Sequence, residues 1–117
     1  NFVYGDIKLS KTSLKGNETL TASVTVTNNS NVDGKEVIQL YIRDIVGSNT
    51  RPVKELKGFE KILIKAGETK TIQFKISTKD LMFYNNELKY IWEAGDFDIM
   101  IGGNSRDVKK AKVNWTK

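Results

Sequence analysis

The sequence predicts an all-β protein, an antiparallel β-sandwich of about seven short strands. Three observations lead to this fold class. Apolar and polar residues alternate with a period of two along much of the chain, turn-forming residues recur at near-regular intervals, and no segment has the periodicity of a long helix. Short strands separated by turns are typical of a sandwich, although a closed barrel would show the same periodicity and stays open as an alternative.

The first half of the chain contains the clearest alternation. Apolar side chains alternate with threonine or serine over residues 20–27, which predicts a half-buried strand with its hydroxyl groups facing water. Asparagine, aspartate and glycine in 28–34 supply turn residues. The next strand is expected at 37–44, with branched aliphatic residues on one face, and a short strand at 7–9 precedes both.

The middle of the chain is predicted to form a loop followed by another strand. The loop covers residues 44–51, and Pro52 favours an extended conformation for Arg51 before it. The strand covers residues 56–64. Gly58 inside this strand indicates a β-bulge or a close approach of another segment to the backbone.

The second half is predicted to add a helical turn, a hairpin and three longer strands. One helical turn is expected at 78–82, capped by Ser77 or Thr78. Asn85 and Asn86 would turn the hairpin. The strands of this half are expected at 71–76, 83–84, 88–92, 96–101 and 108–115.

Length and composition fit one domain spanning residues 1–117 with its own hydrophobic core. The absence of cysteine excludes disulfides and thiolate metal sites, and it leaves the cellular compartment unknown. No apolar run approaches the ~20 residues of a membrane-spanning helix, so no membrane partner is expected. The chain begins with Asn1 instead of Met, which predicts a fragment of a longer protein.

The net charge of +5 arises from 19 basic and 14 acidic residues. The lysines are scattered, with one modest basic cluster formed by Arg106, Lys109, Lys110 and Lys112. A nucleic-acid-binding surface would interleave such a stripe with aromatic residues, and this pattern is absent. We therefore expect no nucleic-acid partner.

Candidate catalytic and metal-binding residues are few. Histidine is absent, which removes the commonest general base and metal ligand. Asp96 and Asp98 are two residues apart on an expected strand, and we interpret them as two solvated carboxylates. Glu55 and Glu60 could form a carboxylate pair for glycoside cleavage, but flanking lysines favour surface ion pairs. The sequence predicts no catalytic residue, metal site or cofactor.

Three aromatic residues form a candidate carbohydrate platform. Tyr90 and Trp92 alternate on one expected strand, and Trp115 lies near the end of another. Exposed aromatic rings can stack on the apolar faces of sugars. The alternative is that these rings pack in the core or against a neighbouring domain.

Several segments together carry a resemblance to a known family. They are Gly34–Tyr41, Lys54–Lys61, Gly67–Thr71, Asp80–Tyr84 and Glu93–Phe97. In order and spacing they resemble the fibronectin type III-like, immunoglobulin-like domain at the C-terminal end of family 3 glycoside hydrolases, which include β-glucosidases and β-xylosidases. Ala66–Gly67 and Ala94–Gly95 stand where that family often has Pro-Gly.

The resemblance implies an accessory role without catalysis. In such enzymes the nucleophile and acid/base belong to upstream domains, so the expected partners are the catalytic domains of the same polypeptide. The expected inter-domain contact involves Arg51, Lys54, Glu55, Phe59 and Glu60. Two alternatives stay open, a carbohydrate-binding module and a free-standing protein-binding sandwich.

Overall fold

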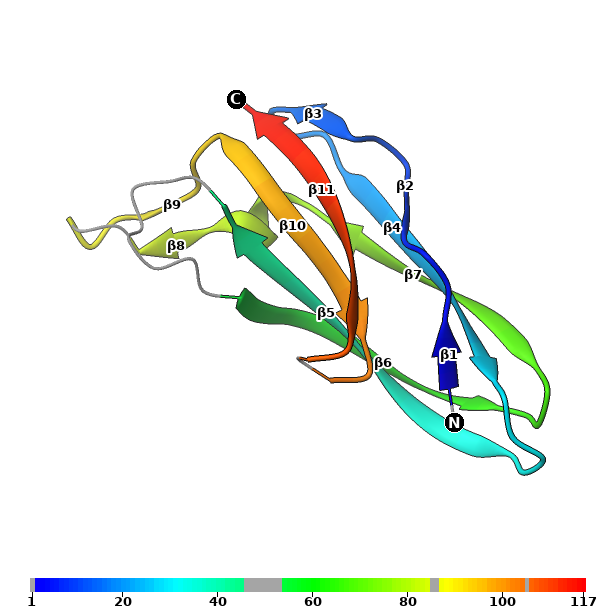
Figure 1. Cartoon of the computed structure of the whole chain (residues 1–117). Helices are drawn as coiled ribbons and strands as arrows, with labels where there is room; N and C mark the ends of the chain where they lie inside the picture. Colours follow the sequence, from blue (N-terminus) through cyan, green and yellow to red (C-terminus); the bar gives the residue numbers. More distant parts are fainter. Residues whose placement is uncertain (1, 46–53, 85–86, 105) are drawn as a thin grey trace.

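The computed structural model describes residues 2–45, 54–84, 87–104 and 106–117. Two sheets face each other and enclose one hydrophobic core, as the sequence predicted (Figure 1). The chain is therefore the predicted β-sandwich. The N-terminal region, where the sequence predicted one short strand, forms three short strands instead.

The four-stranded sheet is built around β4 (Leu20–Asn28). Its antiparallel partner on one side is β7 (Thr69–Ile76). On the other side, β1 (Phe2–Tyr4) and β2 (Lys8–Leu9) pair with successive parts of β4. The alternation predicted for 20–27 is confirmed, because every second residue of β4 is buried.

The five-stranded sheet has the order β3-β11-β10-β5-β6. The bounds are Ser13–Lys15 for β3, Val108–Thr116 for β11, Gly95–Gly102 for β10, Gly34–Asp44 for β5 and Lys54–Ile64 for β6. The pair β3–β11 is parallel and the other pairs are antiparallel. Strand β10 lies in the middle of this sheet, and β6 forms one edge.

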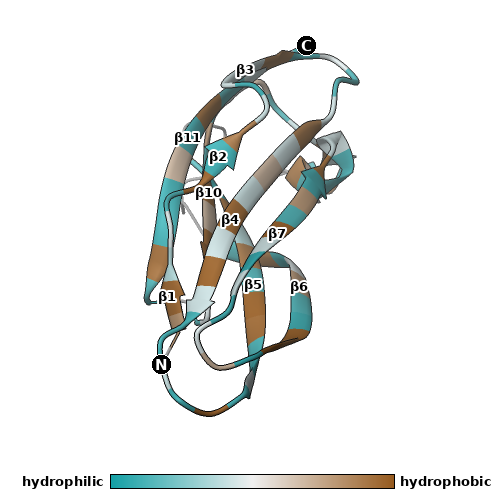
Figure 2. Ribbon diagram, turned by 90° about the vertical axis from the view of Figure 1, so that its right-hand side faces the viewer, coloured by the Kyte–Doolittle hydropathy of each residue, from teal (hydrophilic) through white to brown (hydrophobic). Residues whose placement is uncertain are grey.

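The core consists of the inward-facing side chains of both sheets. Figure 2 shows the resulting alternation of hydrophobic and hydrophilic residues along β4 and β7. Trp115 is fully buried, and its indole Nε1 donates a hydrogen bond to the carbonyl of Gly16 at 3.0 Å. Burial of large side chains in such a core supplies the main driving force for folding.

The β-bulge predicted at Gly58 is confirmed. Gly58 lies opposite Leu40, whereas the next partner pair is Leu56 with Tyr41, so Lys57 is the extra residue on β6. A bulge of this kind twists an edge strand and interrupts its ladder.

A separate hairpin leaves the sandwich after a single 3₁₀ turn at Thr78–Leu81, close to the helical turn predicted from the sequence. Strands β8 (Phe83–Tyr84) and β9 (Tyr90–Ile91) pair only with each other among the described residues. The predicted turn residues Asn85 and Asn86 lie outside the described residues. The hairpin projects from one end of the molecule (Figure 1).

Candidate inter-domain surface

Strand β6 presents a row of large apolar side chains to solvent. Leu56, Phe59 and Leu63 lie opposite Tyr41, Gln39 and Lys35 of β5. On β5 the even-numbered residues, such as Leu40, point into the core, so Tyr41, Gln39 and Lys35 point outward. Their partners on β6 therefore lie on the outer face as well. We call Leu56, Phe59 and Leu63 the β6 apolar surface. Phe59 is 66% exposed, and the other two are about half exposed.

The remaining residues expected at the inter-domain contact are polar, and Glu55 and Glu60 lie opposite the core-facing Ile42 and Ile38, on the other face of β6 from this surface. Glu55 and Glu60 are both exposed on β6, and the Nζ of Lys57 lies 3.3 Å from a carboxylate oxygen of Glu55. Lys54 pairs through its backbone with Arg43, but its side chain lies outside the described residues, as does Arg51. Among the described side chains of this set, that of Phe59 is the apolar one.

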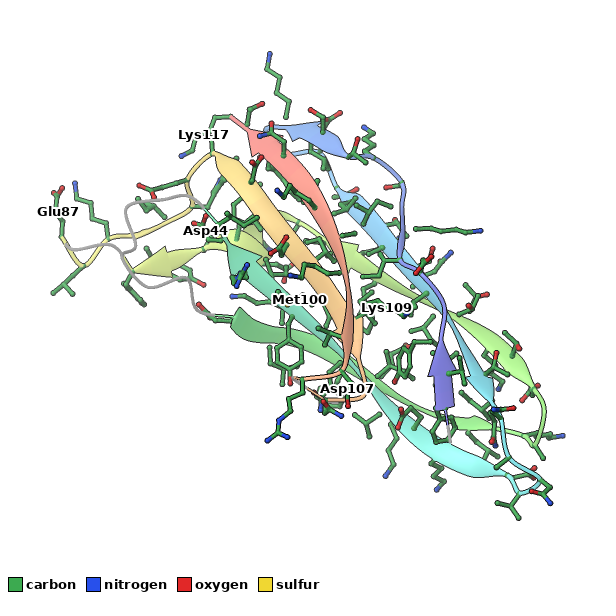
Figure 3. All side chains as sticks on the ribbon, in the orientation of Figure 1. Asp44, Glu87, Met100, Asp107, Lys109 and Lys117 are labelled. Carbon is green, nitrogen blue, oxygen red and sulfur yellow. The ribbon has the colours of Figure 1, made fainter. Side chains whose placement is uncertain are left out.

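An ion pair on the same outer face was missed by the sequence analysis. Asp98 is only 3% exposed, so its interpretation as a solvated carboxylate is wrong. Its carboxylate accepts a hydrogen bond from Nη2 of Arg43 at 3.0 Å. Strand β10 lies between β5 and β11, and the side chain of Arg43 on β5 lies against Asp98 on its outer face. Met100, two residues further along β10 on the same face and labelled in Figure 3, is also buried.

The pair of Asp98 and Arg43 is incompletely satisfied. The Nε of Arg43 is buried and has no hydrogen-bond partner among the described residues. Asp96, by contrast, is partly exposed and accepts a hydrogen bond from the side-chain amide of Asn114 at 2.9 Å. The two aspartates therefore have different surroundings although they share one face of β10.

The structure does not bring Glu55 and Glu60 together as a carboxylate pair suited to glycoside cleavage. Glu55 and Glu60 are exposed on one extended strand, which separates them by roughly 15 Å, whereas retaining and inverting enzymes need about 5–10 Å. Two shallow depressions each contain one carboxylate, that of Asp6 in one and that of Asp107 in the other. No group of three or more potential metal-ligating side chains occurs in the described ranges.

The three aromatic residues expected to form a sugar platform do not share an exposed face. Trp115 is fully buried, so it cannot offer a ring face to a sugar. Trp92 packs partly against the core, with its ring edge-on to Trp115 at a centroid distance of 6.4 Å. Only Tyr90 is well exposed, and its ring lies 4.9 Å from that of Tyr84 on the neighbouring strand. For Trp115 the alternative of core packing is the correct one.

Tyr4 connects the two sheets near the N-terminus. Its hydroxyl on β1 donates a hydrogen bond to a carboxylate oxygen of Glu36 on β5 at 2.8 Å. Burial raises the pKa of Tyr4 well above its ordinary value, and the hydrogen bond and negative charge of Glu36 raise this pKa further. The contact is a structural bond between sheets and not a reactive site.

Within the described residues, no helix has the length and apolarity to cross a membrane.

The fold and this surface define the class of protein, an immunoglobulin-like sandwich with an exposed apolar edge strand. Comparison with known families then gives a match to the fibronectin type III-like domain over residues 36–105. The chain therefore belongs to the fibronectin type III-like domain family, in the form that family 3 glycoside hydrolases carry.

Similar proteins agree with this assignment. The chain is 44% identical over its whole length to a putative β-xylosidase of Formosa agariphila, of which it covers 16%. It is 45% identical over 93% of its length to a periplasmic β-glucosidase of Salmonella typhimurium, of which it covers 14%. It superimposes on the crystal structure of a β-glucosidase from Listeria innocua in complex with isofagomine with a TM-score of 0.91 and 38% identity, covering 16% of that chain. The chain thus corresponds to a small part of each of these enzymes.

Proposed function

We propose that this chain is a non-catalytic accessory domain of a glycosidase that hydrolyses O-glycosyl bonds, of the β-glucosidase or β-xylosidase type. The domain would stabilise the enzyme by packing the β6 apolar surface against the catalytic domains of the same polypeptide. The exposure of Phe59 carries this proposal, because a 66% exposed phenylalanine between two half-exposed leucines is costly in water.

The flanking polar residues fit the same role. Inter-domain surfaces combine apolar centres with polar rims. Glu55 and Glu60 are exposed on the same edge strand as Phe59 but on its other face, and Arg51 and Lys54 precede them in the chain. We propose that these four residues form the rim of the contact. Catalysis is assigned to the parts of the relatives that this chain does not cover.

The experiment compares one substitution in two contexts, the isolated chain and the enzyme that contains it. Phe59→Ser should leave the free energy of unfolding of the isolated chain within about 0.5 kcal/mol, because the side chain is mostly exposed there. In the full enzyme the same change should destabilise by about 2 kcal/mol, the value of burying a phenylalanine.

Gln73→Ser on the exposed face of β7 is the matched control, and it should be neutral in both contexts. Equal effects of Phe59→Ser in the two contexts would refute the packing of β6 on another domain. The isolated chain should show no hydrolysis of aryl glycosides, and turnover that survives repurification would refute the accessory role.

A further inference from the structure

A second cluster of exposed apolar residues lies on the projecting hairpin, separate from β6. Tyr84, Leu88 and Tyr90 are 69%, 81% and 53% exposed. They belong to a two-stranded sheet that has no strand partner in either large sheet among the described residues. We call these three residues the hairpin cluster. An isolated two-stranded hairpin is only marginally stable in water. Large exposed apolar side chains on it add the free-energy cost of their contact with water.

The two tyrosines of the hairpin cluster are already arranged as a unit. Tyr84 lies directly opposite Tyr90 in the register of β8 and β9, so both side chains emerge on one face of the hairpin. Their ring centroids are 4.9 Å apart with an interplanar angle of 40°. The base of the hairpin is held by Trp92, which packs against the core and lies beneath the Nζ of Lys117 at 4.9 Å. The pair is therefore preorganised at the surface.

Leu88 adds a backbone anomaly. Its φ of +62° makes it the only non-glycine residue with positive φ among the described residues. Leucine rarely adopts this left-handed conformation, which glycine and asparagine take with less strain. The side chain gains nothing in return within this chain, because it is 81% exposed. Strain at an exposed apolar residue points to a contact that the isolated chain lacks.

We propose that the hairpin cluster inserts into an apolar recess on the catalytic part of the same polypeptide, as a second contact apart from the β6 apolar surface. This inference rests on the proposed function. The chain covers only 16% of the β-glucosidase on which it superimposes, and the remainder of such an enzyme is tethered to it at a high effective concentration.

The composition of the hairpin favours a protein surface over a sugar as the occupant. Leu88 has no side-chain hydrogen-bonding group, whereas a sugar presents hydroxyls on most of its surface. Tyrosine is enriched at protein interfaces because its ring is rigid and amphipathic. Glu87 and Lys89 are exposed on either side of Leu88 and supply the polar rim, and Glu87 lies at the outer end of the projection (Figure 3).

Leu88→Gly tests the proposal through a change of sign between two contexts. In the isolated chain the substitution relieves the left-handed strain and should raise the melting temperature by about 3 °C. In the full enzyme it removes the inserted side chain and should lower the melting temperature of this domain by a similar amount. Leu88→Asn is the second variant, because asparagine tolerates the same φ while keeping a side chain.

The outcomes separate the two proposals. If Leu88→Gly raises the melting temperature equally in both contexts while Phe59→Ser remains context-dependent, the hairpin contact is refuted and the β6 contact stands. If neither variant depends on context, both proposals fail. Dissociation of an enzyme dimer by Leu88→Gly would assign the hairpin to a second copy instead. A change in KM alone, without a thermal shift, would assign it to substrate, and either result overturns the proposal.

Discussion

The outer faces of the two sheets differ in how they meet solvent. The outer face of β4 and β7 carries threonine, serine, glutamine and lysine, and Val3 on β1 is its one large exposed apolar residue among the described positions. The outer face of the five-stranded sheet contains the buried Asp98 and Met100 in its middle and the β6 apolar surface at its edge. The outer face of β4 and β7 is polar and suited to contact with water. The outer face of the five-stranded sheet has a buried centre and an exposed apolar edge that is suited to contact with a neighbouring domain.

This comparison teaches that the strand position in the sheet decides how its outward residues behave. Strand β10 is central, and on its outer face even the carboxylate of Asp98 is buried, in contact with Arg43 of β5. Strand β6 is an edge strand with a neighbour on one side only, so its outward leucines and phenylalanine remain exposed. The two strands show a similar alternation of inward and outward side chains, but the outward residues are buried on β10 and exposed on β6.

The largest effect is expected from breaking the ion pair at the centre of the outer face. Asp98→Ala leaves the Arg43 guanidinium without its carboxylate and should lower the free energy of unfolding of the isolated chain by about 2 kcal/mol. This is below the value for a fully buried pair, because the side chain of Arg43 is 36% exposed. Urea unfolding measures the loss.

Asp96→Ala is the control for that variant, since Asp96 lies on the same face of β10 but is more exposed, and its carboxylate accepts a hydrogen bond from the side chain of Asn114. It should cost less than Asp98→Ala. Equal costs would contradict the view that the centre of this face is closed. The double variant Arg43→Met with Asp98→Leu should recover much of the loss, because apolar groups of similar size can replace a buried ion pair.

A smaller effect, visible mainly at high pH, is expected from the bond that joins the two sheets. The unfolded tyrosine ionises near pH 10, whereas burial and Glu36 hold the pKa of Tyr4 higher in the folded chain. Between these two values the unfolded state has released a proton that the folded state keeps. The stability contributed by Tyr4 is therefore complete below pH ~10 and is lost as the pH rises above it.

Tyr4→Phe should remove this pH dependence and cost about 1 kcal/mol at pH 7 through the lost hydrogen bond to Glu36. The measurement is the difference in unfolding free energy between wild type and variant from pH 7 to pH 11. The other ionisable groups are common to both proteins, so their contributions cancel in this difference. A difference that stays constant across this range would show that Tyr4 is not held neutral by the fold.

The smallest effect in the isolated chain is expected from exchanging residues between the two outer faces. Leu56→Gln on β6 and Gln73→Leu on β7 should each change its unfolding free energy by less than about 0.5 kcal/mol, because both sites are exposed. In the full enzyme Leu56→Gln should cost about 1 kcal/mol and Gln73→Leu nothing, since the proposed contacts cover β6 and not the outer face of β7. Differential scanning calorimetry of both proteins makes the comparison. A loss from Gln73→Leu in the enzyme would mean that the face of β7 is also covered.

Much of the fold could be predicted from the sequence because local chemistry and topology agree. The expected strand at 20–27 is β4, that at 71–76 falls within β7, and the bulge at Gly58 lies where the glycine indicated it. The polar turn at 28–34 was also expected. The hydrogen bonds that organise this turn were not expected. Asn28 is buried, and its side-chain amide donates hydrogen bonds to the carbonyls of Val32 and of Ile64, which is distant in sequence.

The candidate surface could be predicted only in part. Phe59 was identified, and it is exposed on β6, but Leu56 and Leu63 were not. Their signal was present in the spacing around the bulge, since inserting one residue at Lys57 brings Leu56 to the same face as Phe59 and Leu63. Tyr84 and Leu88 were missed as well, because a short hairpin has no periodicity that indicates which residues another element covers.

The sequence by itself determined the period of each strand, the turns between strands and the family to which the chain belongs, because these depend on neighbouring residues and their order. Only the tertiary structure decided that Asp98 and Trp115 are buried while Phe59, Tyr84 and Leu88 are exposed. Burial depends on which strands lie beside a residue and on which side of them, and those neighbours are distant along the chain. The same alternation therefore leads to a closed face at β10 and an open one at β6.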